Sequence, residues 1–419
     1  MATTTVSVAE TCAAAKRASR TLAALPSAVR DGALEAIAEA LESRVDEILE
    51  ANARDVEAAR NEYPAAFVDK LTLNPSRVAG MVAGVRAIVA LPDPVGEVID
   101  GRRLPNGLDL RRVRVPLGLV AVVYEARPNV TIDAAALCLK SGNAIVLRGS
   151  SAAARSNAVL AQVASSAATA AGLPEDCVAL LGGGREEIAE LATQSGVVDL
   201  IVPRGGEGLK ASLKGVATVP VIYAASGNCH VYVEASAQQD EAQAIVLNAK
   251  LQRPGVCNAA ETLLVHQDIA DSFLPGALGA LSEAGVTLHG DERSRAAAPN
   301  LPVLEATEED WATEYLALEI AVAVVGSTEA AIEHINAYGS GHSEAIVTGD
   351  AAAARAFELG VDAACVYVNA STRFTDGYEF GMGAEIGNST QKLHARGPIG
   401  LRELCTFKYL IEGSGQVRA

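Results

Sequence analysis

Residues 117–124 read Leu-Gly-Leu-Val-Ala-Val-Val-Tyr, a short apolar run in which β-branched residues are common. Gly118 lies near its start and Pro128 follows it, so the run is too short and too firmly bounded for a helix. Because its apolar residues follow one another without alternation, the run predicts a strand buried on both faces. Such strands occur in parallel sheets that are covered by helices.

Helices and strands are predicted to alternate from this strand onward. In the first half, helices are expected at 131–140, 153–171, 186–193 and 209–213, and strands at 144–147, 178–181, 200–202 and 219–222. In the second half, helices are expected at 241–250, 269–281 and 328–338, and strands at 262–266, 322–325 and 345–348. Alternation at this pitch predicts a parallel, doubly wound α/β architecture, and no Pro- or Ser-rich linker marks a boundary between the halves.

Two helices are predicted before the first strand. Ser7 and Glu10 have the spacing of a capping box, which opens an Ala-rich helix. A second helix is predicted by apolar residues three and four positions apart: Leu34, Ile37, Leu41, Val45 and Ile48.

The composition excludes several classes of protein. Half of the residues are apolar and a fifth are charged, which argues against disorder. The length of 419 residues predicts two or three compact units. The 34 Lys and Arg against 51 Asp and Glu give a formal net charge of −17, which disfavours a nucleic acid or an anionic lipid as partner. An anionic ligand would need a local group of cations or helix N-termini.

Targeting and cysteine patterns indicate a reducing compartment. There is no apolar run of 18 residues and no basic segment followed by an apolar core at the start. The seven cysteines are irregularly spaced without C-x-x-C, and the six histidines form no H-E-x-x-H. We therefore expect a cytoplasmic protein with a small-molecule partner, no membrane and no metal.

Residues 248–265 carry the strongest chemical signal. A predicted helix ends there, a Pro-Gly turn follows, and Cys257 precedes an apolar strand, with Lys250 and Arg253 close by in sequence. Nearby cations and backbone N–H groups favour a thiolate, which is what a nucleophilic cysteine needs. The alternative is a buried small apolar residue, and we prefer that interpretation for Cys138, Cys177 and Cys365.

Three short segments after predicted strands could bind phosphate. They are Gly182-Gly-Gly, Arg204-Gly205-Gly206-Glu-Gly and Arg148-Gly-Ser150-Ser151. Ligands bind at this end of the strands in open α/β sheets. The glycine runs do not match G-x-G-x-x-G and are equally consistent with tight turns, and the third segment is equally consistent with a solvated loop.

The final 50 or so residues are polar and rich in glycine, a composition that favours a functional connection. Arg373 in this region is of the type that binds a carboxylate bidentately, although a solvated loop without function is the alternative. Among the histidines, His230 and His342 are the two candidates for a role.

Five blocks of sequence carry a resemblance to a known family. They are VVYEARPNVT (122–131), KSGNAIVLRG (140–149), LIVPRGG (200–206), NAKLQRPGVCNAAETLLVH (248–266) and VNASTRFTDGYEFGMGAEIGNSTQKLHARGP (368–398). In this order they resemble the gamma-glutamyl phosphate reductases of the aldehyde dehydrogenase superfamily. The resemblance implies that NADPH reduces L-glutamyl 5-phosphate to L-glutamate 5-semialdehyde and phosphate, the second step of proline biosynthesis.

The resemblance also assigns roles to residues. Cys257 matches the nucleophile, and Asn129 is the candidate for a side-chain oxyanion donor. NADPH is expected to bind Arg148, Ser150, Ser151, Arg204, Gly205, Gly206 and Glu314, with Ser151 in place of an acid that would repel a 2′-phosphate. Arg253, Arg373 and His230 are expected to bind the substrate.

Residues 223–228 depart from related enzymes in two ways. They contain no glutamate, so the general base of hydrolytic relatives is missing, as expected of an enzyme that must keep its thioester from water. Tyr223-Ala-Ala-Ser226 also lacks the more polar residues expected in the family. Another aldehyde dehydrogenase, a cofactor-free thiol hydrolase and a non-catalytic scaffold are the competing hypotheses.

The resemblance implies an aldehyde-dehydrogenase-like α/β fold of three regions, two doubly wound parallel α/β domains and a small oligomerisation segment. We expect an NADPH-binding domain at 1–128 and 144–228 and a catalytic domain at 229–366. Residues 129–143 and 380–419 are expected to form a small oligomerisation segment, which gives a homodimer or homotetramer.

Overall fold

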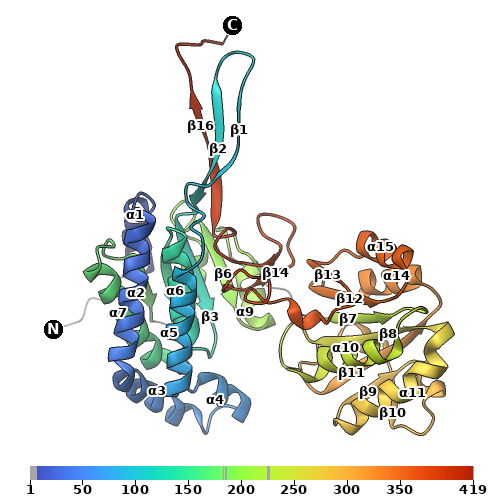
Figure 1. Ribbon diagram of the computed structural model, residues 1–419. Helices are drawn as coiled ribbons and strands as arrows, with labels where there is room; N and C mark the ends of the chain where they lie inside the picture. Colours follow the sequence, from blue (N-terminus) through green and yellow to red (C-terminus); the bar gives the residue numbers. More distant parts are fainter. Residues whose placement is uncertain (1–6, 183, 185, 224–226, 419) are drawn as a thin grey trace. The chain divides into compact units, whose positions relative to one another are not determined.

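The computed structural model describes residues 7–182, 184, 186–223 and 227–418. Within these residues the chain divides into two compact units (Figure 1). The first comprises residues up to 223 with 381–387 and 399–419, and the second comprises 224–380 with 388–398. The expected boundary at 228/229 lies five residues from the observed division, and each unit is described by itself below.

The first unit is built on a parallel sheet with the strand order β5-β4-β3-β6. Its strands are β3 (Leu119–Tyr124), β4 (Ala144–Arg148), β5 (Val178–Leu181) and β6 (Leu200–Arg204). Every residue of β3 and β4 is buried, which confirms the strands predicted from continuous apolar runs. Alternate residues of β3 pack with Val8, Cys12 and Ala15 of the first helix.

Nine helices surround this sheet among the described residues. They are α1 (Val8–Leu22), α2 (Ser27–Ser43), α3 (Val45–Ala59), α4 (Ala65–Leu71), α5 (Pro75–Val89), α6 (Asn129–Lys140), α7 (Ala154–Ala170), α8 (Glu186–Ala192) and α9 (Glu207–Lys214), with a 3-10 turn, η1 (Ser151–Ala153), before α7. The Ser7–Glu10 capping box is confirmed. The side chains of residues 130–140 in α6 are buried apart from half-buried Asp133, and a role for this segment in oligomers stays a prediction.

Two predictions for the first unit are wrong. The single helix predicted over 34–48 is two helices, because the backbone at Arg44 leaves the helical conformation (φ −110°, ψ 22°) between α2 and α3. The buried side chains of the predicted helix are divided between the two: α2 contributes Leu34, Ile37 and Leu41, and α3 contributes Ile48. The apolar spacing therefore continues from one helix into the next. The strand predicted at 219–222 is only one bridge between Val221 and Ile201.

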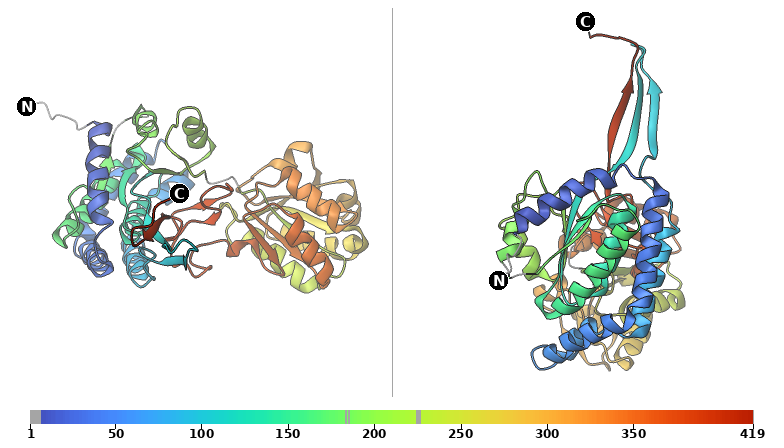
Figure 2. Two further views of the ribbon diagram at one scale, coloured as in Figure 1. Left: turned by 90° about the horizontal axis from the view of Figure 1, so that it is seen from above. Right: turned by 90° about the vertical axis from the view of Figure 1, so that its left-hand side faces the viewer.

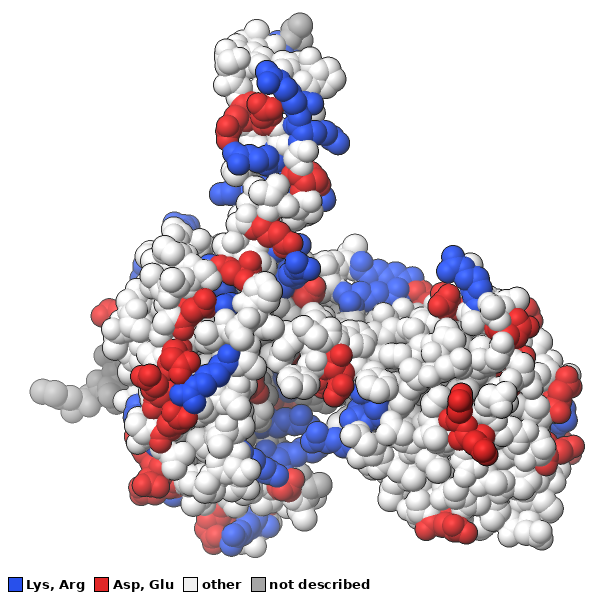
Figure 3. Space-filling model, viewed as in Figure 1, with Lys and Arg blue, Asp and Glu red and all other residues white. Residues whose placement is uncertain are grey.

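A three-stranded antiparallel arm projects from the first unit (Figures 1 and 2). It consists of β1 (Val98–Arg103), β2 (Asp109–Pro116) and β16 (Cys405–Glu412) in the order β1-β2-β16. Acidic and basic side chains alternate over it in the face shown in Figure 3. Exposed Phe407, Tyr409 and Ile411 share one face of β16, and Arg112 stacks on Phe407 with 4.9 Å to the ring centroid.

The second unit contains a seven-stranded, all-parallel sheet in the order β10-β9-β11-β8-β7-β12-β13. Its strands are β7 (Cys229–Val233), β8 (Ala260–His266), β9 (Thr287–Gly290), β10 (Val303–Glu305), β11 (Glu319–Val325), β12 (Ser343–Val347) and β13 (Cys365–Val368), and a separate two-stranded ladder joins β14 (Asn388–Ser389) to β15 (Gly397–Pro398). The strands predicted at 262–266, 322–325 and 345–348 are confirmed with slightly different ends.

Helices cover both faces of the seven-stranded sheet. They are α10 (Gln239–Leu251), α11 (Gln267–Glu283), α12 (Glu292–Ala297), α13 (Glu308–Ala312), α14 (Thr328–Tyr338) and α15 (Ala351–Gly360), and a short 3-10 turn, η2 (Thr372–Phe374), follows β13. One core packs α10 and α11 against one face, and a second core packs α14 and α15 against the other. The two units confirm the predicted parallel α/β architecture.

A buried carboxylate fixes the helix that follows Arg148-Gly-Ser-Ser. Asp55 of α3 is 1% exposed and accepts hydrogen bonds from the Ser156 N–H (2.8 Å) and the Ser156 hydroxyl (2.7 Å) of α7. Arg155 also donates to it from a guanidinium nitrogen at 3.2 Å. The start of α7 is therefore held in place from a helix a hundred residues away in sequence.

We expect Asp55→Ala to destabilise the first unit by about 3 kcal/mol, because it leaves the Ser156 donors without their charged acceptor. By calorimetry, this loss lowers the Tm of the unit by about 6–12 °C. Glu57→Ala, at an exposed position of the same helix, serves as the control and is expected to cost less than about 1 kcal/mol. Equal effects from both substitutions would contradict the anchoring role.

Candidate active site

Cys257 lies in the turn that joins α10 to β8 in the second unit. It is half-buried, whereas Cys12, Cys138, Cys177, Cys229, Cys365 and Cys405 are all buried. Burial raises the pKa of the Cys12 thiol to about 11 and the pKa values of the Cys177 and Cys405 thiols to about 12. Of the seven thiols, Cys257 is therefore the most accessible to solvent and small molecules.

The backbone of Cys257 is supported from the start of β7. A Cβ atom placed on Gly227 would lie 1.6 Å from the carbonyl oxygen of Cys257, so no side chain fits at this position. The thiol of Cys229 points to the same carbonyl oxygen, with Sγ 3.2 Å from it. Sequence analysis missed Gly227, because nothing in the local sequence shows that it approaches a turn thirty residues away.

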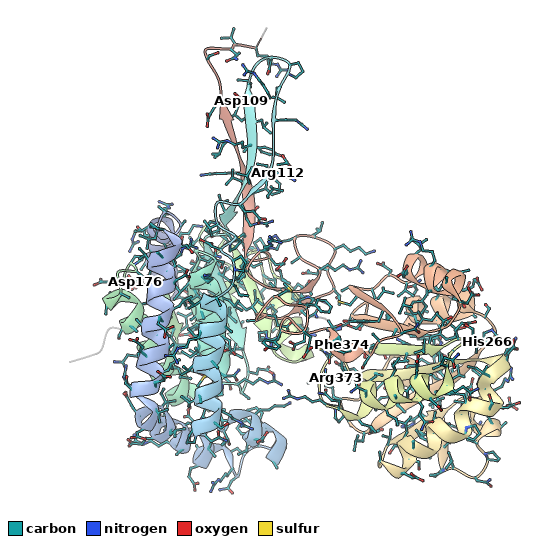
Figure 4. All side chains as sticks on the ribbon, viewed as in Figure 1. Asp109, Arg112, Asp176, His266, Arg373 and Phe374 are labelled. Carbon is teal, nitrogen blue, oxygen red and sulfur yellow. The ribbon has the colours of Figure 1, made fainter. Side chains whose placement is uncertain are left out.

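Two arginines accompany the thiol. Arg253 is exposed in the same turn, and Arg373 lies in η2 and is labelled in Figure 4. Burial and the like charge of Arg253 lower the pKa of Arg373, and the nearby sulfur of Cys257 acts in the opposite direction. The structure thus brings together three of the residues that the sequence selected.

Asn258 locks η2 onto the Cys257 turn. Its side-chain amide donates to the carbonyl oxygen of Thr375 (2.9 Å), and its backbone carbonyl accepts from the hydroxyl of Thr372 (2.7 Å). The guanidinium of Arg373 donates to the side-chain oxygen of Asn258 and, through Nε, to Gln252 at 2.7 Å. These bonds orient Arg373 toward the turn, and Asn258 is a second residue that sequence analysis overlooked.

Lys250 does not lie beside the thiol as an open cation. Its ammonium is fully buried and forms an ion pair with the carboxylate of Glu261, with Nζ 2.5 Å from Oε2. The cationic character expected around Cys257 therefore comes from Arg253 and Arg373.

His230 is also placed differently from the expectation. Its ring is fully buried in the middle of the sheet, where Nδ1 lies 3.0 Å from Oε2 of Glu344, which also accepts the His230 N–H. A buried ring that is paired with a buried carboxylate holds two strands together and does not face a substrate. We therefore withdraw His230 as a substrate ligand.

Glu314 lies between α13 and β11 and accepts the Gly227 N–H at Oε1, over 2.6 Å. It therefore touches the glycine that supports Cys257. Its expected contact with a nicotinamide ribose stays a prediction.

Apart from Glu314, which belongs to the second unit, the residues expected to bind the cofactor lie at the ends of strands β4 and β6 of the sheet in the first unit or directly after them. β3 pairs in parallel with both β4 and β6, in a register that places Arg148 opposite Val123 and Arg204 opposite Tyr124. The guanidinium of Arg148 donates to the carbonyl oxygens of Gly149 (3.1 Å) and Gly184 (2.9 Å). Its head group is therefore held where the strands end, the place where open α/β sheets bind ligands.

The turns at this edge fit a dinucleotide in part. Ser150 caps η1 by accepting the Ala152 N–H, and Ser151 is exposed. Both side chains are uncharged, so neither adds a negative charge next to Arg148. The N–H of Gly206, in contrast, donates to the carboxylate of Glu125 at 3.2 Å, so this N–H already has an acceptor within the protein and does not point to a phosphate. Arg148 and the two serines fit an anionic cofactor better than the glycine turn does.

Asn129 begins α6 in the first unit, and its amide donates to Asp133 at 2.8 Å. Burial raises the pKa of Asp133 to about 6, and Asn129 and Arg204 act in the opposite direction. The side-chain N–H group expected to stabilise an oxyanion is thus engaged with a carboxylate, and that catalytic role stays a prediction.

Three predictions from the sequence concern the stretch 223–226, metal binding and membrane insertion. Most of Tyr223–Ser226 lies outside the described residues, since 224–226 are not among them. In the described part of the chain, no three His, Cys, Asp or Glu side chains are grouped as metal ligands. The same residues include no helix with the length and apolar character of a membrane span.

Comparisons with known proteins agree on the family. Residues 1–299 match the family described as "Aldehyde dehydrogenase family". Gamma-glutamyl phosphate reductases of Moorella thermoacetica and Thermobifida fusca are 57% and 56% identical over 406 residues, which is 96% of this chain and 97% of each relative. The crystal structure of gamma-glutamyl phosphate reductase from Thermotoga maritima is 45% identical, with a TM-score of 0.96 over 99% of this chain and 100% of that one. The chain therefore belongs to the gamma-glutamyl phosphate reductases of the aldehyde dehydrogenase family.

Proposed function

We propose that the chain reduces L-glutamyl 5-phosphate to L-glutamate 5-semialdehyde and phosphate with NADPH, through a thioester on Cys257. The observation that carries the proposal is the half-buried thiol of Cys257 next to Arg253 and Arg373. One thiol is accessible for covalent catalysis, and two cations are available for an anionic substrate. The reaction is the second step of proline biosynthesis, and the names of the relatives support it.

In the first step, the Sγ of Cys257 attacks the carbonyl carbon of the acyl phosphate, and the bond from that carbon to the phosphate oxygen breaks. Arg253 and Arg373 neutralise the phosphate and the carboxylate of the substrate. Backbone N–H groups of the Cys257 turn stabilise the oxyanion, and one such donor is worth about 3–4 kcal/mol.

For the second step, Arg148, Ser150 and Ser151 would hold NADPH by its adenosine phosphate, and the bound cofactor would supply a hydride to the thioester carbon. Collapse of the resulting thiohemiacetal anion breaks the bond between carbon and sulfur, releases the aldehyde and restores the Cys257 thiolate. Residues 223–228 contain no glutamate that could activate water, and this protects the thioester from hydrolysis.

We propose that Arg148, Ser150 and Ser151 bind the adenosine phosphate of NADPH. Arg148 supplies a positive charge at the end of β4, and the two serines supply hydroxyl groups without an opposing negative charge. We further propose that the protein acts in the cytoplasm as a homodimer or homotetramer, with residues 380–419 in the contacts between copies.

Replacing Cys257 with Ala should abolish the phosphate-dependent oxidation of the semialdehyde, because no nucleophile remains, while binding of NADPH persists. The measurements are steady-state turnover and fluorescence titration of NADPH. Cys365→Ala in the same unit is the control and should retain its turnover. Residual activity above about a hundredth of the parent value, a loss below ~2.7 kcal/mol, would rule out covalent catalysis.

Iodoacetamide at neutral pH should label Cys257 before any other cysteine, because the other six are buried. Mass spectrometry after short exposure identifies the site, and loss of activity should follow the labelling of Cys257. Faster labelling of Cys138, whose pKa burial raises, would contradict the assignment of the accessible thiol.

Ser151→Glu should raise the KM for NADPH at least about tenfold and leave the KM for NADH nearly unchanged, because a carboxylate repels the 2′-phosphate. Ser166→Glu at an exposed position of α7 adds the same charge away from Arg148 and is the control. An equal effect of the two substitutions, or of one substitution on both cofactors, would refute the proposed phosphate site.

A further inference from the structure

A buried ion pair brackets Cys257 in sequence and in space. Lys250 lies in the last turn of α10, seven residues before the cysteine, and Glu261 lies on β8, four residues after it. Both side chains are 0% exposed, and Nζ lies 2.5 Å from Oε2. The pair therefore ties together the two ends of the turn that presents the thiol.

The second oxygen of Glu261 holds a third segment. Its Oε1 accepts the Leu316 N–H at 3.2 Å. Leu316 has a φ of +54°, a conformation that a leucine keeps only where its surroundings impose it. A Cβ atom on Gly255 would lie 3.6 Å from the Leu316 carbonyl oxygen, so this segment packs against the Cys257 turn itself.

From Leu316 the contacts lead back to the nucleophile. Glu314, two residues earlier, accepts the Gly227 N–H at 2.6 Å, and Gly227 packs directly on the carbonyl of Cys257. The carboxylate of Glu261 is thus connected to Cys257 along the chain and, separately, through the segment that carries Glu314.

Stability alone is a poor explanation for the pair. Removing two charges from water costs about as much as their attraction returns, and apolar residues of similar volume often serve equally well. Burial accordingly raises the pKa of Glu261 to about 7 and lowers that of Lys250. What apolar residues cannot supply is a fixed acceptor for the Leu316 N–H.

We propose that Lys250 and Glu261 are positioning residues that fix the Cys257 turn and the Glu314 segment relative to each other. The proposal rests on the function proposed above for Cys257. Lys250 orients the carboxylate, and the carboxylate sets the Leu316 backbone and hence Glu314 and Gly227. Neither residue touches the substrate.

The decisive experiment separates position from stability with the double substitution Lys250→Met and Glu261→Leu in the full chain. We expect its Tm to lie within about 6 °C of the parent, because no charge is left unpaired and only the Leu316 N–H loses its acceptor. We expect kcat to fall at least fivefold and the KM for NADPH to rise as well, because the substitution also displaces Glu314, the expected contact of the nicotinamide ribose. Glu261→Gln, which keeps the size and one acceptor, tests the same point if the double variant does not fold, and it should also lower kcat at least fivefold.

Lys140→Met is the matched control, because Lys140 is a 2% exposed lysine that is paired with Asp31 in the first unit. It should lose thermal stability and keep its kcat within twofold. A folded double variant, or a folded Glu261→Gln variant, whose kcat falls less than fivefold would overturn the positioning role. If Cys257→Ala stays active, the proposed function itself is wrong, so the two failures are distinguishable.

Discussion

The contact between Gly227 and the carbonyl oxygen of Cys257 is the tightest constraint on the candidate active site. It leaves no space for a side chain, and it fixes the distance between the start of β7 and the turn before β8. The two strands are neighbours in the sheet, so the turn is set by the backbone of the fold itself. A nucleophile that is held in this way needs little reorganisation before it reacts.

Several polar groups behind this turn are bonded to other protein groups, although His230 Nε2 and Glu344 Oε1 are buried without a hydrogen-bond partner among the described residues. The amide of Asn258 binds η2, the carboxylate of Glu344 binds His230, and Glu261 binds both Lys250 and Leu316. Buried networks of this kind specify one arrangement, because each broken bond leaves a costly unpaired group. The bonded groups behind the nucleophile are buried, while Arg253 in the Cys257 turn is exposed.

The sequence predicted the buried parts of the fold better than the exposed parts. Continuous apolar runs such as Leu119–Tyr124 have one solution, a strand covered on both faces, and the structure contains it. The arm was missed because Arg111 and Arg112 give β2 no apolar pattern, and one of its two partner strands, β16, lies about 300 residues later. The break at Arg44 was missed because apolar spacing continued across two consecutive helices.

The sequence predicted those parts of the candidate site in which the residue type alone indicates a reactive or charged group. Cys257 and Arg373 have distinctive reactivity or charge, and the structure places them together. Lys250 and His230 are equally good candidates in the sequence, because both can carry a positive charge. In the structure both side chains are buried, Lys250 against the carboxylate of Glu261 and His230 against that of Glu344. Those partners lie on other strands, and no local pattern reveals them.

The arm has a consequence for the order in which the protein can mature. Every residue of β2 pairs with β16, and Arg111 meets Glu412 across a separation of 301 residues. At roughly 5–20 residues per second, a ribosome needs about 15–60 s to make the intervening chain. The second unit is synthesised in that interval and can fold completely while β2 has only β1 to pair with, so the arm that begins with β1 is among the last parts of the chain to be finished.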